Sequence, residues 1–202
     1  MPNPEQPACA GFVLTGGRSS RMGKEKALLE ISGTPLLVRA VHLLQKICPC
    51  VKIVGQPERY ARFGFIGIGD QQPDSGPLAG ILAALDQTTA PWNLVVACDM
   101  PYLSEEWLCY LTSRARASSA LVLLPESQHG PEPLCAVYHR DGAAALRAEF
   151  EQGVLKVTRA LESLPVERIS SSEITSFDPH GVLFQNLNTP EEYEQARADL
   201  EA

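Results

Sequence analysis

The chain has 202 residues, with 17 Lys and Arg against 24 Asp and Glu, which gives a formal net charge of −7. Hydrophobic residues at 45% and charged residues at 20% are typical of a globular protein with a substantial core, and they exclude disorder for most of the chain. The acidic balance argues against a general nucleic-acid-binding protein, which would carry a broad basic face.

No apolar run approaches the ~20 residues that a membrane span needs, and the first residues lack the basic patch and apolar core of a signal peptide. We expect residues 1–9 to form a flexible leader and residues 10–202 to form one domain. The cysteines are scattered, which favours reduced thiols in the cytoplasm over a disulfide framework (Cys9, Cys48, Cys50, Cys98, Cys109, Cys135). Cys48 and Cys50 form the only tight pair, whereas a structural zinc site would need four ligands.

Short apolar runs alternate with longer segments of helical spacing along the chain. The runs predict strands at Gly11–Leu14, Val51–Val54, Phe65–Ile68, Trp92–Cys98, Ala120–Leu124, Pro133–His139 and Val182–Gln185. Apolar residues at three- and four-residue steps predict helices at 36–47, 78–85, 104–116, 143–150 and 154–164, with another starting at Thr189-Pro190. This alternation predicts a single three-layer α/β domain with a mostly parallel sheet and helices on both faces.

The first predicted strand runs into a glycine-rich basic segment, LTGGRSSRMGKEK, from Leu14 to Lys26. It holds four cations and one acidic residue in an otherwise acidic chain. Glycines let backbone N–H groups approach an anion, and Arg and Lys form charge-assisted hydrogen bonds with phosphate oxygens. The segment matches neither a Walker A loop nor the dinucleotide fingerprint. It favours a phosphate-binding loop over a surface loop that is basic by chance.

Three further segments lie where predicted strands end. Asp99 follows the most apolar strand, where a carboxylate can hold Mg²⁺, although an Asp before Pro often caps a helix or forms a turn. The segment from Asp70 to Gly80 has the residues of a base or ribose pocket, or of a βα loop with close helix packing at Gly80. Asn186 and Asn188 could bind a metal or ligand, but as turn residues they favour a structural role.

Five ordered segments spanning about residues 11–196 resemble those of one enzyme family: LTGGRSSRMGKEKALLEISGTPLL, GPLAGILAAL, ACDMPYL, EPLCAVY and NLNTPEEY. The family is that of the molybdenum cofactor guanylyltransferases (MobA), a branch of the nucleotidyltransferases, which transfer a nucleoside monophosphate and release pyrophosphate. The resemblance implies a Rossmann-like fold, GTP and a molybdopterin-type cofactor as substrates, Mg²⁺ as cofactor, a cytoplasmic location, and transient contact with proteins that deliver or accept the molybdenum cofactor.

The resemblance also implies roles for individual residues. Nucleotide contacts fall on Leu14, Thr15, Gly16, Gly17, Lys26, Asp70 and Asp99. Lys26, Asp99 and Arg21 would be catalytic, with Arg18 as an alternative to Arg21, and Asp99 would hold Mg²⁺. Asn188 matches a position that assists near the metal. Thr15 departs from the family, which usually has alanine there.

The implied reaction is an in-line attack by the terminal phosphate of molybdopterin on the α-phosphorus of GTP, which needs no general base. Candidate residues for the acceptor site lie in the polar loop 125–133 (Glu126, His129, Glu132). Three alternatives stay open: a cytidylyl- or guanylyltransferase for another phosphorylated acceptor, a nucleotide-sensing domain without chemistry, and a redox or metal protein built on the cysteines.

Overall fold

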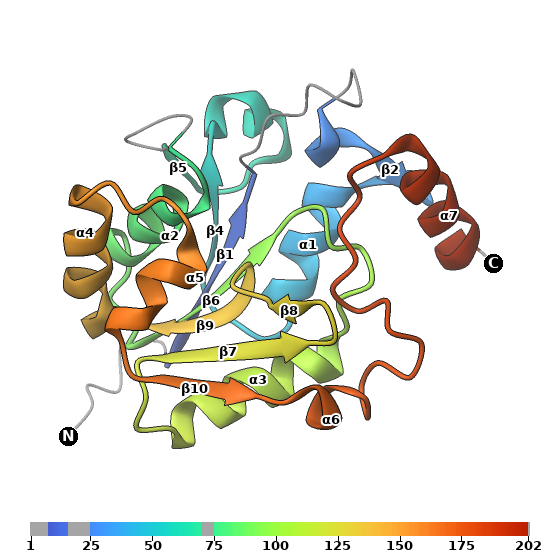
Figure 1. The fold of residues 1–202 in the computed structure, drawn as a ribbon. Coiled ribbons are helices and arrows are strands. Elements are labelled where there is room, and N and C mark those ends of the chain that lie inside the picture. Colours follow the sequence, from blue (N-terminus) through green and yellow to red (C-terminus); the bar gives the residue numbers. More distant parts are fainter. Residues whose placement is uncertain (1–7, 16–24, 70–74, 202) are drawn as a thin grey trace.

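The computed structural model describes residues 8–15, 25–69 and 75–201. Among these residues an eight-stranded sheet forms the middle layer (Figure 1). Its strands are β1 (Cys9–Leu14), β4 (Val51–Gly55), β5 (Gly67–Gly69), β6 (Trp92–Ala97), β7 (Val122–Ser127), β8 (Gly130–Pro131), β9 (Cys135–His139) and β10 (Val166–Ile169). They lie in the order β10-β7-β9-β6-β1-β4-β5, with β8 paired to β7. Within the seven-strand path, only β9 runs antiparallel to its neighbours, so the prediction of a mostly parallel sheet is confirmed.

Helices cover both faces of the sheet, as the alternating pattern predicts. On one face α1 (Leu36–Gln45), α3 (Glu105–Ala117) and α6 (Ser171–Ile174) share an apolar core with the sheet. On the other face α2 (Pro77–Asp86), α4 (Ala143–Glu151) and α5 (Val157–Ala160) pack into a second core. All six residues of β1 and of β6 are buried, because these central strands are covered from both sides.

The C-terminal segment adds a small third core beside this domain. Helix α7 (Pro190–Glu201) packs against the hairpin of β2 (Glu30–Ile31) and β3 (Thr34–Pro35). Its start has the predicted cap: the Glu192 N–H donates to the Thr189 hydroxyl, and the Thr189 N–H donates to the Glu192 carboxylate at 2.9 Å. The Tyr193 hydroxyl donates to the Glu30 carbonyl at 2.7 Å, which ties the helix to the hairpin.

The structure corrects several boundaries. Val182–Gln185 is not a strand. Asp178 accepts the backbone N–H groups of Val182 and Leu183, and Phe184 packs edge-on against Trp107, so this apolar run fills a core without joining the sheet. The polar-looking segment Val166–Ile169 is the strand β10 instead.

Two other boundaries differ. The predicted helix 154–164 is a short α5 followed by a 3-10 turn at Leu161–Ser163. Cys9, expected in the leader, is the buried first residue of β1 and belongs to the sheet. None of the described helices is both long enough and apolar enough to cross a membrane.

Candidate active site

The site lies where the chain changes direction across the sheet. From β1 the chain continues to β4 on one side, and it later returns to β6 on the other side of β1. Open α/β sheets bind ligands at such a switch point, beyond the carboxyl ends of the strands. Leu14 and Ala97 are partners at the ends of β1 and β6, and the Cys98 N–H donates to the Leu14 carbonyl at 3.1 Å.

Three side chains from distant parts of the sequence meet at this edge. The ammonium group of Lys26 lies 3.2 Å from Oδ2 of Asp99 and donates to Oδ1 of Asn188 at 2.7 Å. Lys26 starts a 3-10 turn, Asp99 follows β6, and Asn188 precedes α7. The Leu187 N–H donates to the backbone carbonyl of Asp99 at 3.0 Å, which holds the two loops together. Both charged side chains are about four-fifths buried, with exposed fractions of 20% and 19%.

Glu25, the residue before Lys26, is anchored to the 3-10 helix Pro57–Phe63. The hydroxyl of Tyr60, a buried residue of the 3-10 helix Pro57–Phe63, donates to the carboxylate of Glu25, and Arg59 lies 3.8 Å from the same carboxylate. Burial, followed by the bond to Glu25, raises the pKa of the Tyr60 phenol well above its usual range, so it stays a neutral donor. No local spacing signal in the sequence identifies this anchor, which joins residues 35 positions apart.

The end of β1 is fixed from two sides. The backbone N–H and the hydroxyl of Thr15 both donate to the Val54 carbonyl at 2.9 Å, so this side chain is held against β4. A Cβ on Gly80 would lie 3.3 Å from Leu14, which confirms the close helix packing expected there. Gly76 precedes α2 with φ of +83°, a conformation that favours glycine. The strand end is therefore held between β4 and α2.

The remaining predicted nucleotide contacts fall outside the described residues. They are Gly16, Gly17 and Asp70, and the catalytic candidate Arg21 also lies outside the described residues. The structure thus brings together Lys26, Asp99 and Asn188 and places Leu14 and Thr15 at the neighbouring strand end. The sequence pattern favours a turn role for Asn188, because an asparagine before a helix carries no local sign of a lysine contact made 162 positions away.

A cavity of about 340 Å³ opens beside Asn188. Ser127, His129 and Glu132 from the polar loop line it, together with Asn186 and Asn188. Glu132 accepts a hydrogen bond from the Ser127 hydroxyl at 2.7 Å, and burial raises the pKa of its carboxyl group. Glu126, the third candidate in that loop, instead pairs with Arg168 at 3.3 Å. Two of the three acceptor-site candidates therefore line a cavity whose lining includes Asn188, the partner of Lys26.

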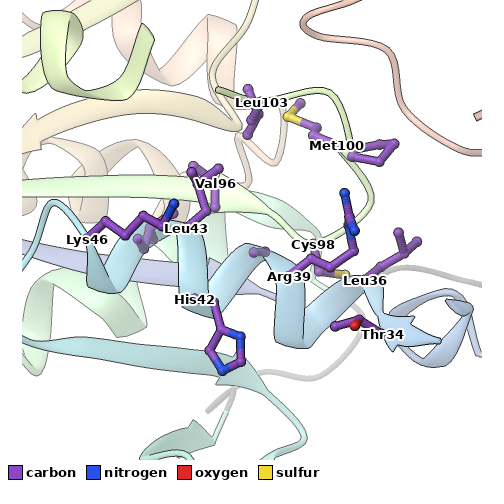
Figure 2. Close-up of a pocket in the computed structure, with 13 residues that line it drawn as sticks. Thr34, Leu36, Arg39, His42, Leu43, Lys46, Val96, Cys98, Met100 and Leu103 are labelled. Carbon is purple, nitrogen blue, oxygen red and sulfur yellow. The ribbon is translucent and has the colours of Figure 1, made fainter. Parts of the chain in front are cut away.

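A second cavity of about 330 Å³ lies between α1 and the loop that follows β6 (Figure 2). Arg39, Cys98, Met100 and Leu103 line it, and Lys46 at its edge pairs with Glu105 at 3.0 Å. Among the described residues its lining includes none of Lys26, Asp99 and Asn188. Of these two cavities, only the one beside Asn188 therefore shares a lining residue with the contact of Lys26, Asp99 and Asn188.

The side-chain oxygen atoms of Asp99 and Asn188 suit a metal ion that binds together with a nucleotide. Within residues 8–15, 25–69 and 75–201, no three His, Cys, Asp or Glu side chains come close enough to enclose a metal. Mg²⁺ is commonly held by one or two carboxylates and completes its shell with water and substrate phosphates. The Asp99 carboxylate and the Asn188 amide oxygen fit that pattern.

Comparison with known proteins identifies the family. The model of the MobA-like NTP transferase domain matches residues 11–166, which include Lys26 and Asp99. The chain belongs to this family. The molybdenum cofactor guanylyltransferase of Syntrophotalea carbinolica is 31% identical over 93% of this chain and 90% of its own. That of Desulfosudis oleivorans is 30% identical over 96% and 97%.

The fold agrees with this membership. The crystal structure of molybdopterin-guanine dinucleotide biosynthesis protein A from Archaeoglobus fulgidus has a TM-score of 0.83 to this chain at 28% identity, covering 95% of this chain and 98% of its own. As a member of the MobA-like NTP transferase family, the protein is a nucleotidyltransferase enzyme. The Rossmann-like single-domain fold expected from the sequence is confirmed.

Proposed function

We propose that this nucleotidyltransferase transfers GMP from GTP to the terminal phosphate of molybdenum-molybdopterin, giving the guanine dinucleotide form of the cofactor and pyrophosphate. The observation that carries the proposal is the contact of Lys26 with Asp99 and Asn188 at the switch point of the sheet. The names of relatives that match almost the whole chain supply the substrates.

In the proposed reaction an oxygen of the acceptor's terminal phosphate attacks the α-phosphorus of GTP. The bond from that phosphorus to the β-phosphate oxygen breaks, and pyrophosphate leaves. Because the nucleophile is already an anion, the residues of the site need to position and neutralise charge and not to remove a proton. Lys26 would exchange its bond to Asp99 for phosphate oxygens, and Arg21 would add positive charge near the leaving group.

The proposed metal is Mg²⁺, which would neutralise phosphate charge when bound. Asp99, released by Lys26, would hold it with one carboxylate oxygen, and Asn188 would keep Lys26 oriented. Leu14, Thr15, Gly16, Gly17 and Asp70 would contact the nucleotide. The fixed strand end at Leu14 and Thr15 supports the first two of these assignments.

We place the molybdopterin acceptor in the cavity beside Asn188. A pterin ring presents neighbouring N–H donors at one edge, and Glu132, the Ser127 hydroxyl and the Asn186 amide supply oxygen acceptors in the lining. Its terminal phosphate would then lie toward Lys26, whose ammonium group donates to Asn188 in the lining of this cavity. Proteins that deliver molybdopterin or receive the product would contact the enzyme transiently, and the reaction would take place in the cytoplasm.

The first test is thermal unfolding with GTP, CTP and ATP, each with and without Mg²⁺. A ligand at ~100 times its Kd adds about 2.7 kcal/mol, or roughly 5–10 °C in Tm for a chain of this size. We expect a shift for GTP that is larger with Mg²⁺, and that is lost in Lys26→Ala but kept in Lys52→Ala, a surface lysine bonded to the Gln87 carbonyl.

Pyrophosphate release with molybdopterin present then distinguishes transfer from sensing. An equal or larger shift with CTP would move the protein to the cytidylyltransferases. GTP binding without pyrophosphate release in the presence of acceptor would instead indicate a sensor domain. GTP-dependent release only with another phosphorylated acceptor would keep the guanylyl chemistry and overturn the choice of molybdopterin.

A further inference from the structure

Two buried thiols meet at the end of the sheet opposite the active site. Cys9 begins β1, and Cys48 lies in the turn between α1 and β4. Their sulfur atoms are 3.7 Å apart, and the two residues are 1% and 2% exposed. The Gly11 N–H donates to the Cys50 carbonyl at 2.8 Å, so the two chain segments are already held side by side by the pairing of β1 with β4.

We propose that Cys9 and Cys48 form a reversible disulfide in the folded protein, with Cys50 as the thiol through which it is made. A disulfide joins its sulfurs at about 2.0 Å, so the pair must close by roughly 1.7 Å, a movement within the reach of small side-chain rotations. This site lies outside the nucleotidyltransferase chemistry and does not depend on the function proposed above.

The hydrogen bond between the thiols prepares one of them for attack. The Cys48 thiol donates to the Cys9 sulfur, and this bond lowers the pKa of Cys9 and raises that of Cys48. A thiolate is the form that attacks a disulfide. Cys9 is therefore the thiol suited to close the bond, and Cys48 is the sulfur that it attacks.

Cys50 can react with a disulfide in solution, whereas Cys9 and Cys48 are buried. It is half-buried, two positions beyond Cys48. The Cys50 thiolate attacks a small-molecule disulfide such as glutathione disulfide and releases one glutathione thiol. Cys48 passes its proton to the Cys9 sulfur, to which it donates, as it displaces the second glutathione from Cys50. Cys9 then displaces Cys50 from Cys48, and its proton goes to the departing Cys50 thiolate. Each attacking thiol loses its proton and each departing thiolate regains one, so two protein thiols and one glutathione disulfide give one protein disulfide and two glutathione thiols.

The disulfide would stabilise the folded protein and leave the residues of the candidate active site unchanged. It would close the loop from residue 9 to residue 48, which contains Lys26. This cross-link would lower the conformational entropy of the unfolded chain. Cys9 and Leu14 are at opposite ends of a six-residue strand, roughly 17 Å apart. Disulfides of cytoplasmic proteins are commonly transient and redox-sensing, which suits a bond made by exchange with glutathione.

The test uses the full chain incubated with glutathione disulfide and then analysed by intact mass and non-reducing peptide mapping. We expect the loss of two hydrogens, a peptide pair joining Cys9 to Cys48, and a rise in Tm of roughly 5–10 °C that dithiothreitol reverses. Cys9→Ala and Cys48→Ala should abolish the cross-link. Cys50→Ser should give the same product at least about tenfold more slowly, because only the entry thiol is lost.

Cys109→Ser is the matched control, since Cys109 is an exposed thiol on α3. This variant should form the cross-link at the wild-type rate. The proposal is overturned if folded protein yields only glutathione adducts, if Cys48 ends up joined to Cys50, or if the 9–48 link forms only in denaturant. The GTP-induced shift in Tm should be equal in the reduced and oxidised forms. The Cys9–Cys48 cross-link is detected by mass without any nucleotide, so it tests this proposal even if the proposed function fails.

Discussion

Lys26 and Asp99 are 73 positions apart in the sequence, yet the lysine ammonium lies 3.2 Å from the aspartate carboxylate. The pair forms because the segment after β1 and the end of β6 meet at the same edge of the sheet, where Leu14 and Ala97 are partners. The opposite charges of the two side chains compensate each other in this contact. The same two groups carry the charges that a nucleotide phosphate and its metal would bind.

Lys26→Ala should remove phosphate binding without unfolding the protein. We expect kcat/KM for pyrophosphate release to fall by at least ~100-fold, because a charge-assisted phosphate contact is lost. The free energy of unfolding without nucleotide should change by less than about 1 kcal/mol, since the ion pair is still partly solvated. Steady-state kinetics and urea unfolding measure the two quantities. Wild-type kcat/KM in this variant would refute the role of Lys26.

Asp99→Asn keeps the shape of the side chain and removes its charge. We expect turnover to fall by roughly 100- to 1,000-fold, and the Mg²⁺-dependent part of the GTP-induced Tm shift to disappear. Asp86→Asn is the control, because Asp86 pairs with Arg147 on the surface of α2 and α4. Titration of GTP binding at several Mg²⁺ concentrations makes the comparison. An unchanged metal dependence would remove Asp99 from the metal site.

Asn188→Ala tests whether the loop before α7 acts on the reaction through Lys26. We expect kcat to fall by roughly 10- to 100-fold while the Kd for GTP changes by less than about threefold, because Lys26 stays present but loses its orienting partner. Gln195→Ala, an exposed change on α7, should leave both values unchanged. A large rise in Kd with unaltered kcat would show that Asn188 binds the nucleotide directly.

The stability of the protein should depend on pH through a cluster that joins α3, β10 and α6. The Tyr110 hydroxyl, with Arg114 and Ser170, lowers the pKa of the Glu173 carboxyl from its usual 4.5 to about 2. A folded-state pKa below the unfolded value gives stability that is complete above pH 4.5 and is lost as the pH falls toward 2. The Tm should therefore decrease over this window.

Tyr110→Phe removes the largest cause of that shift, so the fall in Tm between pH 5 and about 2 should become shallower. Tyr138→Phe is the comparison variant, because the Tyr138 hydroxyl donates to the Pro133 carbonyl, which does not titrate. It should lower the Tm by a similar amount at every pH. Differential scanning calorimetry across the window measures both, and an unchanged slope in Tyr110→Phe would contradict the assignment.

The local elements could be predicted from the sequence, and Lys26 and Asp99 could be named there as candidate site residues. Strand and helix patterns depend on the spacing of neighbouring residues, so the buried strand before Asp99 and the cap at Thr189 could be recognised directly. The glycine-rich basic segment marked the region of Lys26 for the same reason. The alternation of these elements was enough to predict a mostly parallel sheet with two helical layers.

Which residues meet from distant parts of the sequence depends on the tertiary fold. The run Val182–Gln185 has the composition of a strand, but Asp178 binds its backbone and Phe184 enters the core beside Trp107. Local spacing likewise carries no information about the contact of Asn188 with Lys26 or of Cys9 with Cys48. These contacts depend on strand order and on the path of the C-terminal segment, which are set by how the apolar faces of all the elements are buried together.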